Sequence, residues 1–221
     1  MDHHRPGLPE DLPAPATLWA RWALLAVLTA REEDEDLGIH RTGNWITEDT
    51  LHLDDCGTTR WWLTRSGEDR WVLYGEDEAS RVKWHKPAID MLAGAPDWLP
   101  YEDLRDLIEG YELGCVYWWE NGAWARAPYP DTLDDDGLDC GMSRFSDQRG
   151  VFNEMISWEL LDGTFDEAAA GPLLADAEQY RLTPERLEEL VTATPERDWD
   201  LPAMLRALRR TGLSGQESVR A

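Results

Sequence analysis

Residues 50–74 read TLHLDDCGTTRWWLTRSGEDRWVLY, and apolar side chains in this stretch recur at every second position. A period of two is typical of β-strands, and the Asp, Gly and Ser residues that interrupt it are typical of turns. The pattern predicts an antiparallel meander over residues 44–85. The expected strands are Thr50–Leu53, Thr58–Thr64, Arg70–Tyr74 and, as a candidate fourth, Arg81–His85.

Aromatic residues fall on both faces of this meander. Because successive side chains of a strand point to opposite faces, Trp61 and Trp62 must point apart, and so must Trp71 and Val72. A sheet with one face in water would show a cleaner polar side. We therefore expect both faces to be covered, one by the core and the other by helices or by a partner.

A second strand signal lies further along the chain. The apolar segments Cys115–Glu120 and Ala123–Ala127 flank Asn121 and Gly122. An Asn-Gly pair between two such segments predicts a two-residue hairpin with a type I′ turn. Together with the meander, this hairpin predicts an antiparallel sheet of five or six strands.

Helical patterns precede and follow the sheet. Residues 17–31 are apolar on nearly every side, with Thr17 as the candidate N-cap, which favours a central core helix and leaves a partner or dimer helix as the alternative. A shorter helix is expected at Tyr101–Ile108. The C-terminal part predicts helices at 151–161, 165–180, 184–193 and 202–211. The fold class is therefore α+β, with an N-terminal helix and a C-terminal helical set.

Composition also suggests how the chain is divided. Residues 1–16 are rich in proline and are expected to form a flexible arm. Residues 17–161 would form an α+β core domain, 162–211 a helical subdomain and 212–221 a disordered tail. The polar stretch 128–150 is expected to be a long loop, and long loops in compact domains are often functional.

The charge balance restricts the kinds of partner. Asp and Glu number 45 against 21 Lys and Arg, which gives a formal net charge of −24. Like charge repels a phosphate backbone, so direct binding of nucleic acid is not expected. The acidity favours a protein partner with a basic surface, or else reflects a genome-wide compositional bias. The three cysteines lack a Cys-x-x-Cys pair, and no apolar run approaches the ~20 residues of a membrane span, so we expect a cytoplasmic protein.

Tests for known chemistry identify no catalytic, cofactor-binding or metal-binding residue. Asp134, Asp136 and Gly137 match three positions of a calcium-binding EF-hand loop, but Thr132 and Ser143 stand where carboxylates are required. His52 with Asp54 and Asp55 is a conceivable metal cluster. Cys115 and His85 could form a nucleophile and base pair only if the fold brought them together.

Tryptophan is the remaining unusual feature, with 13 residues in the chain. Tryptophan is enriched at binding hot spots, and acidic rims favour basic partners. The candidate partner-binding residues are Trp61, Trp62, Trp71, Trp118, Trp119, Trp124, Asp134, Asp135, Asp136 and Asp139.

These observations lead to three functional hypotheses. The first is a non-enzymatic, acidic protein-binding protein, such as an immunity or inhibitor protein that caps the basic surface of a toxin or of a nucleic-acid-acting partner. The second is a metal-assisted hydrolase with its site in the 128–150 loop. The third is a structural subunit of a larger bacterial assembly. Neither the oligomeric state nor the partner follows from the sequence.

Overall fold

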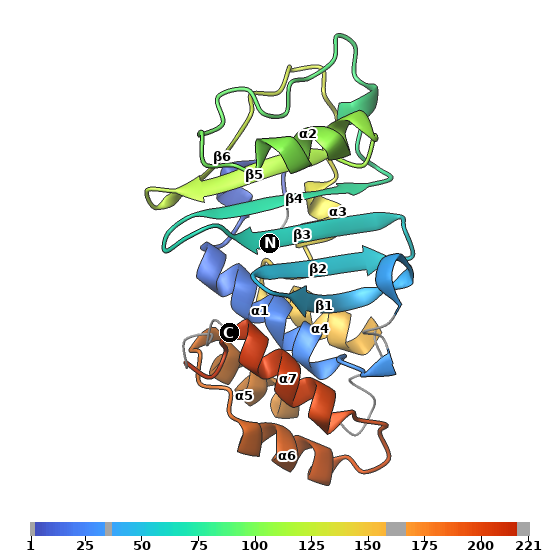
Figure 1. The fold of residues 1–221 in the computed structure, drawn as a ribbon, viewed down its shortest axis with the longest axis vertical. Helices are drawn as coiled ribbons and strands as arrows, with labels where there is room; N and C mark the ends of the chain where they lie inside the picture. Colours follow the sequence, from blue (N-terminus) through green and yellow to red (C-terminus); the bar gives the residue numbers. More distant parts are fainter. Residues whose placement is uncertain (1–2, 34–36, 158–166, 216–221) are drawn as a thin grey trace.

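A computed structural model describes residues 3–33, 37–157 and 167–215, and Figure 1 shows its arrangement. Six strands form one antiparallel sheet in the order β1-β2-β3-β4-β5-β6, so each strand pairs with the next along the chain. The strands are β1 (Gly43–Thr47), β2 (Thr50–Asp55), β3 (Thr59–Arg65), β4 (Trp71–Asp77), β5 (Cys115–Glu120) and β6 (Ala123–Arg126). The predicted α+β fold with its antiparallel meander is confirmed.

The hairpin between β5 and β6 is also confirmed. Asn121 and Gly122 both have positive φ values, 54° and 79°, as a type I′ turn requires. The prediction of a strand at Arg81–His85 is wrong, because Val82–Trp84 forms a 3-10 turn, η4. Strand β4 is already paired with β3 on one side and with β5 on the other, so no sheet edge is left for residues 81–85.

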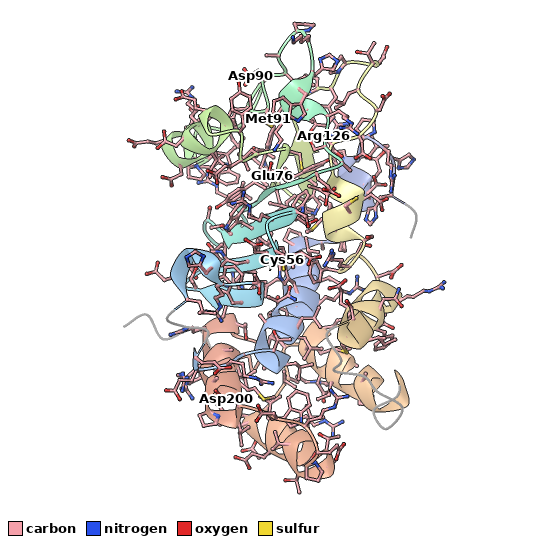
Figure 2. The ribbon with its side chains drawn as sticks, turned by 90° about the vertical axis from the view of Figure 1, so that its right-hand side faces the viewer. Cys56, Glu76, Asp90, Met91, Arg126 and Asp200 are labelled. Atoms are coloured by element: carbon pink, nitrogen blue, oxygen red, sulfur yellow. The ribbon has the colours of Figure 1, made fainter. Side chains whose placement is uncertain are left out.

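Helices cover the sheet unequally. The described helices are α1 (Pro15–Leu28), α2 (Tyr101–Glu109), α3 (Leu138–Met142), α4 (Gln148–Ser157), α5 (Glu167–Glu178), α6 (Pro184–Ala193) and α7 (Leu201–Thr211). In Figures 1 and 2, α2 lies on one side of the sheet, and α1, α3 and α4 lie on the other. We name the two sides the α1 face and the α2 face.

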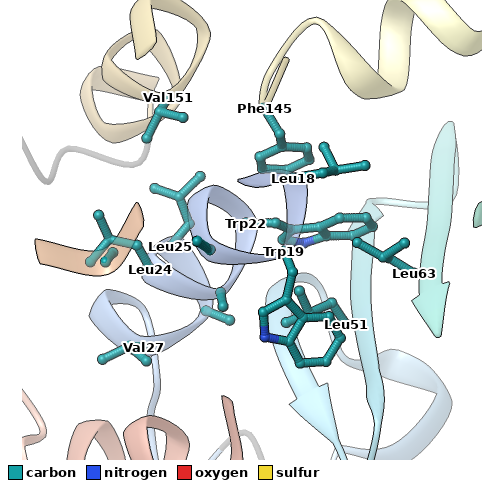
Figure 3. Packing of buried hydrophobic residues seen from close by; sticks show 14 of the residues in the cluster. Leu18, Trp19, Trp22, Leu24, Leu25, Val27, Leu51, Leu63, Phe145 and Val151 are labelled. Carbon is teal, nitrogen blue, oxygen red and sulfur yellow. The ribbon is translucent and has the colours of Figure 1, made fainter. Parts of the chain in front are cut away.

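Helix α1 is the centre of the main core. It starts at Pro15 with Ala14 as its N-cap, not at the predicted Thr17, because the fixed φ of proline suits the first helical position. Trp22 is fully buried and stacks on Phe145 with 4.7 Å between ring centroids, and Leu51 and Leu63 of the sheet pack beside it (Figure 3). The interpretation of this segment as a core helix is confirmed.

The C-terminal helices share this core. Buried side chains of α5, α6 and α7 belong to the same cluster as α1 and the α1 face of the sheet. The Trp19 indole N–H donates to the Thr211 carbonyl oxygen at 2.9 Å, which joins α1 to the end of α7. The domain boundary predicted at 161/162 lies outside the described residues, as do residues 216–221 of the predicted tail. Leu213, within that tail, is fully buried and its carbonyl accepts from the Leu182 N–H.

Two loop expectations also change. The stretch 128–150 contains helix α3. The sequence of this helix is short and contains a glycine, so it does not predict a helix. Residues 3–13 of the proline-rich arm contact β5, β6 and α3 through hydrogen bonds to residues more than 100 positions away. The composition of residues 1–16 carries no information about these contacts, because the partners lie far away in the sequence.

Candidate functional site

The predicted tryptophans do not share one surface. Strand alternation places Trp61, Trp71, Trp119 and Trp124 on the α1 face, and Trp62 and Trp118 on the α2 face. Trp61, Trp71, Trp118 and Trp124 are buried, and only Trp62 and Trp119 are half-buried. Among these six tryptophans, Trp62 is therefore the one that is half-buried and also lies on the α2 face, where no described helix packs against its strand, β3.

Two of the predicted aspartates lie on the other side of the sheet from Trp62, because Asp136 contacts Tyr117 on the α1 face and Asp139 belongs to α3. Asp134 is exposed, Asp135 and Asp139 are half-buried, and Asp136 is buried. The last three accept hydrogen bonds from backbone groups or from the N-terminal arm. The structure therefore separates Asp136 and Asp139 from Trp62, although Leu133 of the same loop belongs to the cluster against which Trp62 packs.

The α2 face of β1–β3 carries a row of aromatic rings. Register aligns Trp45 of β1, His52 of β2, Trp62 of β3 and Tyr74 of β4 side by side. Trp45 and His52 are stacked with 4.9 Å between centroids, and Trp62 and Tyr74 with 5.2 Å. We name these four residues the aromatic row. All four are half-buried, and in Figure 1 no described helix lies in front of β1–β3, whereas α2 covers β4 and β5.

His52 is uncharged within this row. Its burial, together with the nearby Arg41 guanidinium, lowers its pKa from 6.5 to about 4. Its Nε2 lies 2.6 Å from the Thr47 hydroxyl oxygen. His52 therefore adds no positive charge to the row, and the Arg41 guanidinium lies 5.2 Å from the centroid of the Trp45 ring.

A second aromatic group stands at the edge of the same face. Trp84 and Tyr111 are 61% and 58% exposed, and their rings stack with 5.6 Å between centroids. The Lys83 ammonium donates to the Tyr111 carbonyl at 3.0 Å and lies 5.9 Å from the Trp84 ring centroid. Two large aromatic side chains this exposed and held in place by stacking form a ready contact surface.

Ion pairs connect the two aromatic groups. Arg60 and Glu76 are paired across β3 and β4 and lie two residues from Trp62 and Tyr74, respectively, so they lie on the same face. Arg60 contacts Glu76 at 3.4 Å and Glu112 at 3.5 Å, and Lys83 also pairs with Glu76. The aromatic row, the Trp84–Tyr111 pair and this network together form what we name the docking face.

The alternative sites have other contacts. His85 is hydrogen-bonded to the Pro87 carbonyl and to Thr132, while Cys115 is buried on the α1 face, where burial raises its pKa well above the usual value. His52 and Asp54 point away from Asp55, which pairs with Arg144 at 2.8 Å. Within residues 3–33, 37–157 and 167–215, no group of three or more His, Cys, Asp and Glu side chains is placed to hold a metal ion.

Sequence reasoning missed Trp45, Trp84 and Tyr111. The sequence predicts a strand at Arg81–His85, in which neighbouring strands would shield Trp84. The 3-10 turn at Val82–Trp84 instead turns this side chain outward. The cross-strand partner of Trp45 could be identified only once β1 was known to pair with β2. Tyr111 follows the end of α2, and its positive φ of 59° carries no sequence signal.

Comparison with protein-family models, curated proteins and solved structures found no match. No helix in the described ranges combines the length and the apolar character that a membrane crossing requires. The geometry of the docking face is therefore the basis for a functional proposal.

Proposed function

We propose that this chain is a non-enzymatic protein-binding protein that uses its docking face to cap a basic surface of another protein. The observation that carries the proposal is the exposed, stacked Trp84–Tyr111 pair beside the aromatic row. Tryptophan and tyrosine dominate binding hot spots because they bury large areas at a small cost in side-chain entropy.

Charge supports a basic partner. With a net charge of −24, the protein attracts positively charged partners and repels polyanions. On the docking face, the Glu112 side chain is 47% exposed, and Asp103 lies near Tyr74, whose pKa is raised by burial and also by that carboxylate. Arg60 and Lys83 are already paired with glutamates, so they add little positive potential to the face.

The mode of binding follows from these features. Long-range attraction would speed the encounter with the basic surface, and aromatic contacts would hold the complex once it has formed. An inhibitor or immunity protein that covers the nucleic-acid-binding surface of a toxin needs this combination, because it must compete with a polyanion for the same basic residues. We place the chain in that class.

The two alternatives have less support. A metal-assisted hydrolase would need free carboxylates in the 128–150 loop, but Asp135, Asp136 and Asp139 are engaged by the arm or by neighbouring backbone groups. A structural subunit could dock through residues 17–31 or through the arginine-bearing C-terminal helix. The first route would need α1 at the surface, and α1 is buried, whereas Arg209 and Arg210 of α7 are exposed and leave the second route open. Neither has a surface feature comparable to the docking face in the described residues.

The test begins with capture of a partner from the native host at low salt, followed by purification of that partner. Its dissociation constant is then measured by calorimetry for the wild type and for Trp84→Ala. Loss of a hot-spot tryptophan costs about 2 kcal/mol or more, so affinity should fall about 30-fold. Higher salt should slow association more than it speeds dissociation.

Ile156→Ala provides the matched control. Ile156 is 52% exposed on α4, on the opposite side of the sheet, so its truncation removes a similar exposed apolar group outside the docking face. The proposal requires unchanged affinity in this variant. Equal losses in both variants, or no loss in Trp84→Ala, would show that the docking face does not bind the partner.

A further inference from the structure

The N-terminal arm lies in a seat built from buried polar side chains. The Gly7 N–H donates to Asp136 Oδ1 at 2.9 Å. The Gly7 carbonyl oxygen accepts from Arg126 Nε at 2.9 Å and lies 3.0 Å from the Tyr117 hydroxyl. Asp136 is only 1% exposed, so these side chains bind both backbone polar groups of one residue, Gly7, in a place that water hardly reaches.

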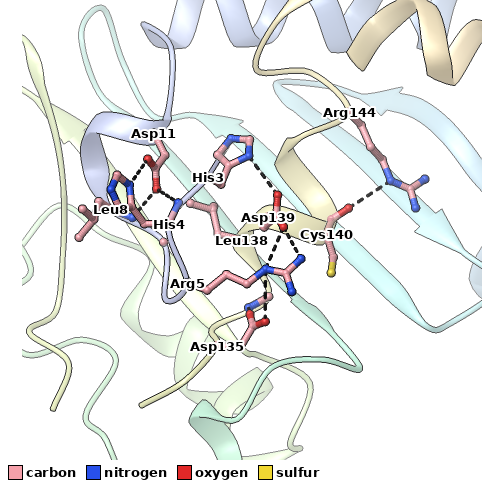
Figure 4. A network of polar contacts seen from close by, with 12 residues as sticks. His3, His4, Arg5, Leu8, Asp11, Asp135, Leu138, Asp139, Cys140 and Arg144 are labelled. Carbon is pink, nitrogen blue, oxygen red and sulfur yellow. Dashed lines mark hydrogen bonds and ion pairs between the residues drawn. The ribbon is translucent and has the colours of Figure 1, made fainter. Parts of the chain in front are cut away.

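Neighbouring carboxylates bind the residues that precede Gly7 in the arm. The Arg5 guanidinium donates twice to Asp139 Oδ2 and lies 3.8 Å from Asp135 (Figure 4). The His3 Nδ1 lies 3.3 Å from Asp139 Oδ1. Arginine is thus recognised by two carboxylates on the edge of the acidic loop.

The seat also selects for glycine. A Cβ on residue 7 would lie 2.4 Å from Leu138 Cδ2 and 2.8 Å from the Tyr117 hydroxyl oxygen, distances that real Cβ atoms essentially never show. Leu138 is fully buried in α3 and cannot move aside freely. The seat therefore accepts an arginine followed two residues later by a glycine.

The arm is held mainly by polar contacts. Of its described residues, only Leu12 belongs to the main buried cluster, and the Arg5 side chain is 56% exposed. A segment with few buried apolar contacts opens at a lower free energy than the packed core does. The seat can therefore become vacant while the sheet and helices remain folded.

We propose that this seat is a binding site for a basic peptide segment of a partner protein, of the form Arg-x-Gly, and that the arm is its built-in occupant. The arm's His3, His4 and Arg5 form a basic cluster in a chain of net charge −24, and this cluster lies on the acidic loop that was expected to receive a partner. Two copies of so acidic a chain repel each other, which favours a different protein over a second copy as the source of the segment. The seat lies on the α1 face, so this site is independent of the docking face.

The experiment uses the full chain with Gly7→Ala, which should expel the arm but leave the seat intact. The probe is a fluorescent peptide with the sequence of residues 1–14, measured by polarisation. It should bind this variant at least about tenfold more tightly than the wild type, in which the tethered arm competes at an effective concentration in the millimolar range. Peptides carrying Arg5→Ala or Gly7→Ala should bind about tenfold more weakly or worse.

A second variant guards against misfolding. Arg5→Ala on the full chain removes only an exposed side chain, and it should also increase peptide binding and amide exchange within residues 3–13. Asp139→Asn in either background should reduce peptide binding. The proposal is overturned if neither arm variant binds the peptide better than the wild type, or if the Gly7→Ala peptide binds equally well. It is also overturned if the variants bind only as dimers with exchanged arms.

Discussion

Gly141→Ala tests the packing of α3 against the sheet. The Trp61 indole is fully buried between two glycines, Gly75 of β4 and Gly141 of α3. A Cβ on residue 141 would lie 2.2 Å from Trp61 Nε1 and 2.3 Å from Cε2. The ring has little room to move, because Gly75 also lies close to it: a Cβ at residue 75 would lie 2.6 Å from Trp61 Cδ2.

The two opposing effects of this substitution can be estimated. Alanine in place of glycine favours a helix by about 1 kcal/mol. Overpacking of a rigid core costs about 1–3 kcal/mol, and a clash with a ring that has little room to move belongs at the upper end. We expect a net loss of about 2 kcal/mol, which corresponds to a melting temperature lower by about 4–8 °C in a chain of this size.

The assay is urea unfolding followed by tryptophan fluorescence, together with thermal melting. Gly110→Ala is the control, because Gly110 has right-handed helical dihedral angles and its nearest neighbour would lie 3.3 Å from the added carbon. We expect the control to change stability by less than about 0.5 kcal/mol. A Gly141→Ala protein as stable as the wild type would refute the placement of Trp61 between the two glycines.

Three further predictions concern individual polar side chains. Tyr117→Phe removes a hydroxyl that lies 2.7 Å from the buried Asp136 carboxylate. In urea titrations this substitution should lower the free energy of unfolding by about 1–3 kcal/mol, and a loss below about 0.5 kcal/mol would contradict this. His52 stays neutral in the fold down to about pH 4, whereas in the unfolded chain it takes up a proton below the ordinary histidine pKa of 6.5, so stability falls as the pH drops through this interval. Between about pH 7 and about pH 5, the wild type should lose about 2 kcal/mol more than His52→Gln, and parallel losses would refute the lowered pKa. Burial and the neighbouring Asp77 raise the pKa of Cys140 to about 11. Iodoacetamide at about pH 8 should therefore alkylate the exposed Cys56 before Cys140, as measured by peptide mass spectrometry. Faster labelling of Cys140 would contradict this prediction.

The sheet is the part of this fold that the sequence determined by itself. A period of two and the Asn-Gly turn depend only on residues a few positions apart, so the meander and the hairpin could be predicted. The same alternation also showed that Trp61 and Trp62 point to opposite faces. The burial of α1 followed from its apolar residues on every side, because such a helix must be covered.

Only the tertiary structure decided which of these residues are accessible. Trp61 and Trp62 are equivalent in the strand pattern, but α1 and α3 pack on the face of Trp61 and leave that of Trp62 half-open. Trp84 is exposed because β5 already occupies the edge of β4 that residues 81–85 would have needed. The arm has partners in the fold because Arg5 and Gly7 bind carboxylates that lie about 130 residues further along the chain. Local sequence patterns report the conformation of a segment, whereas exposure and partners depend on which distant segments pack together, and no local pattern contains that information.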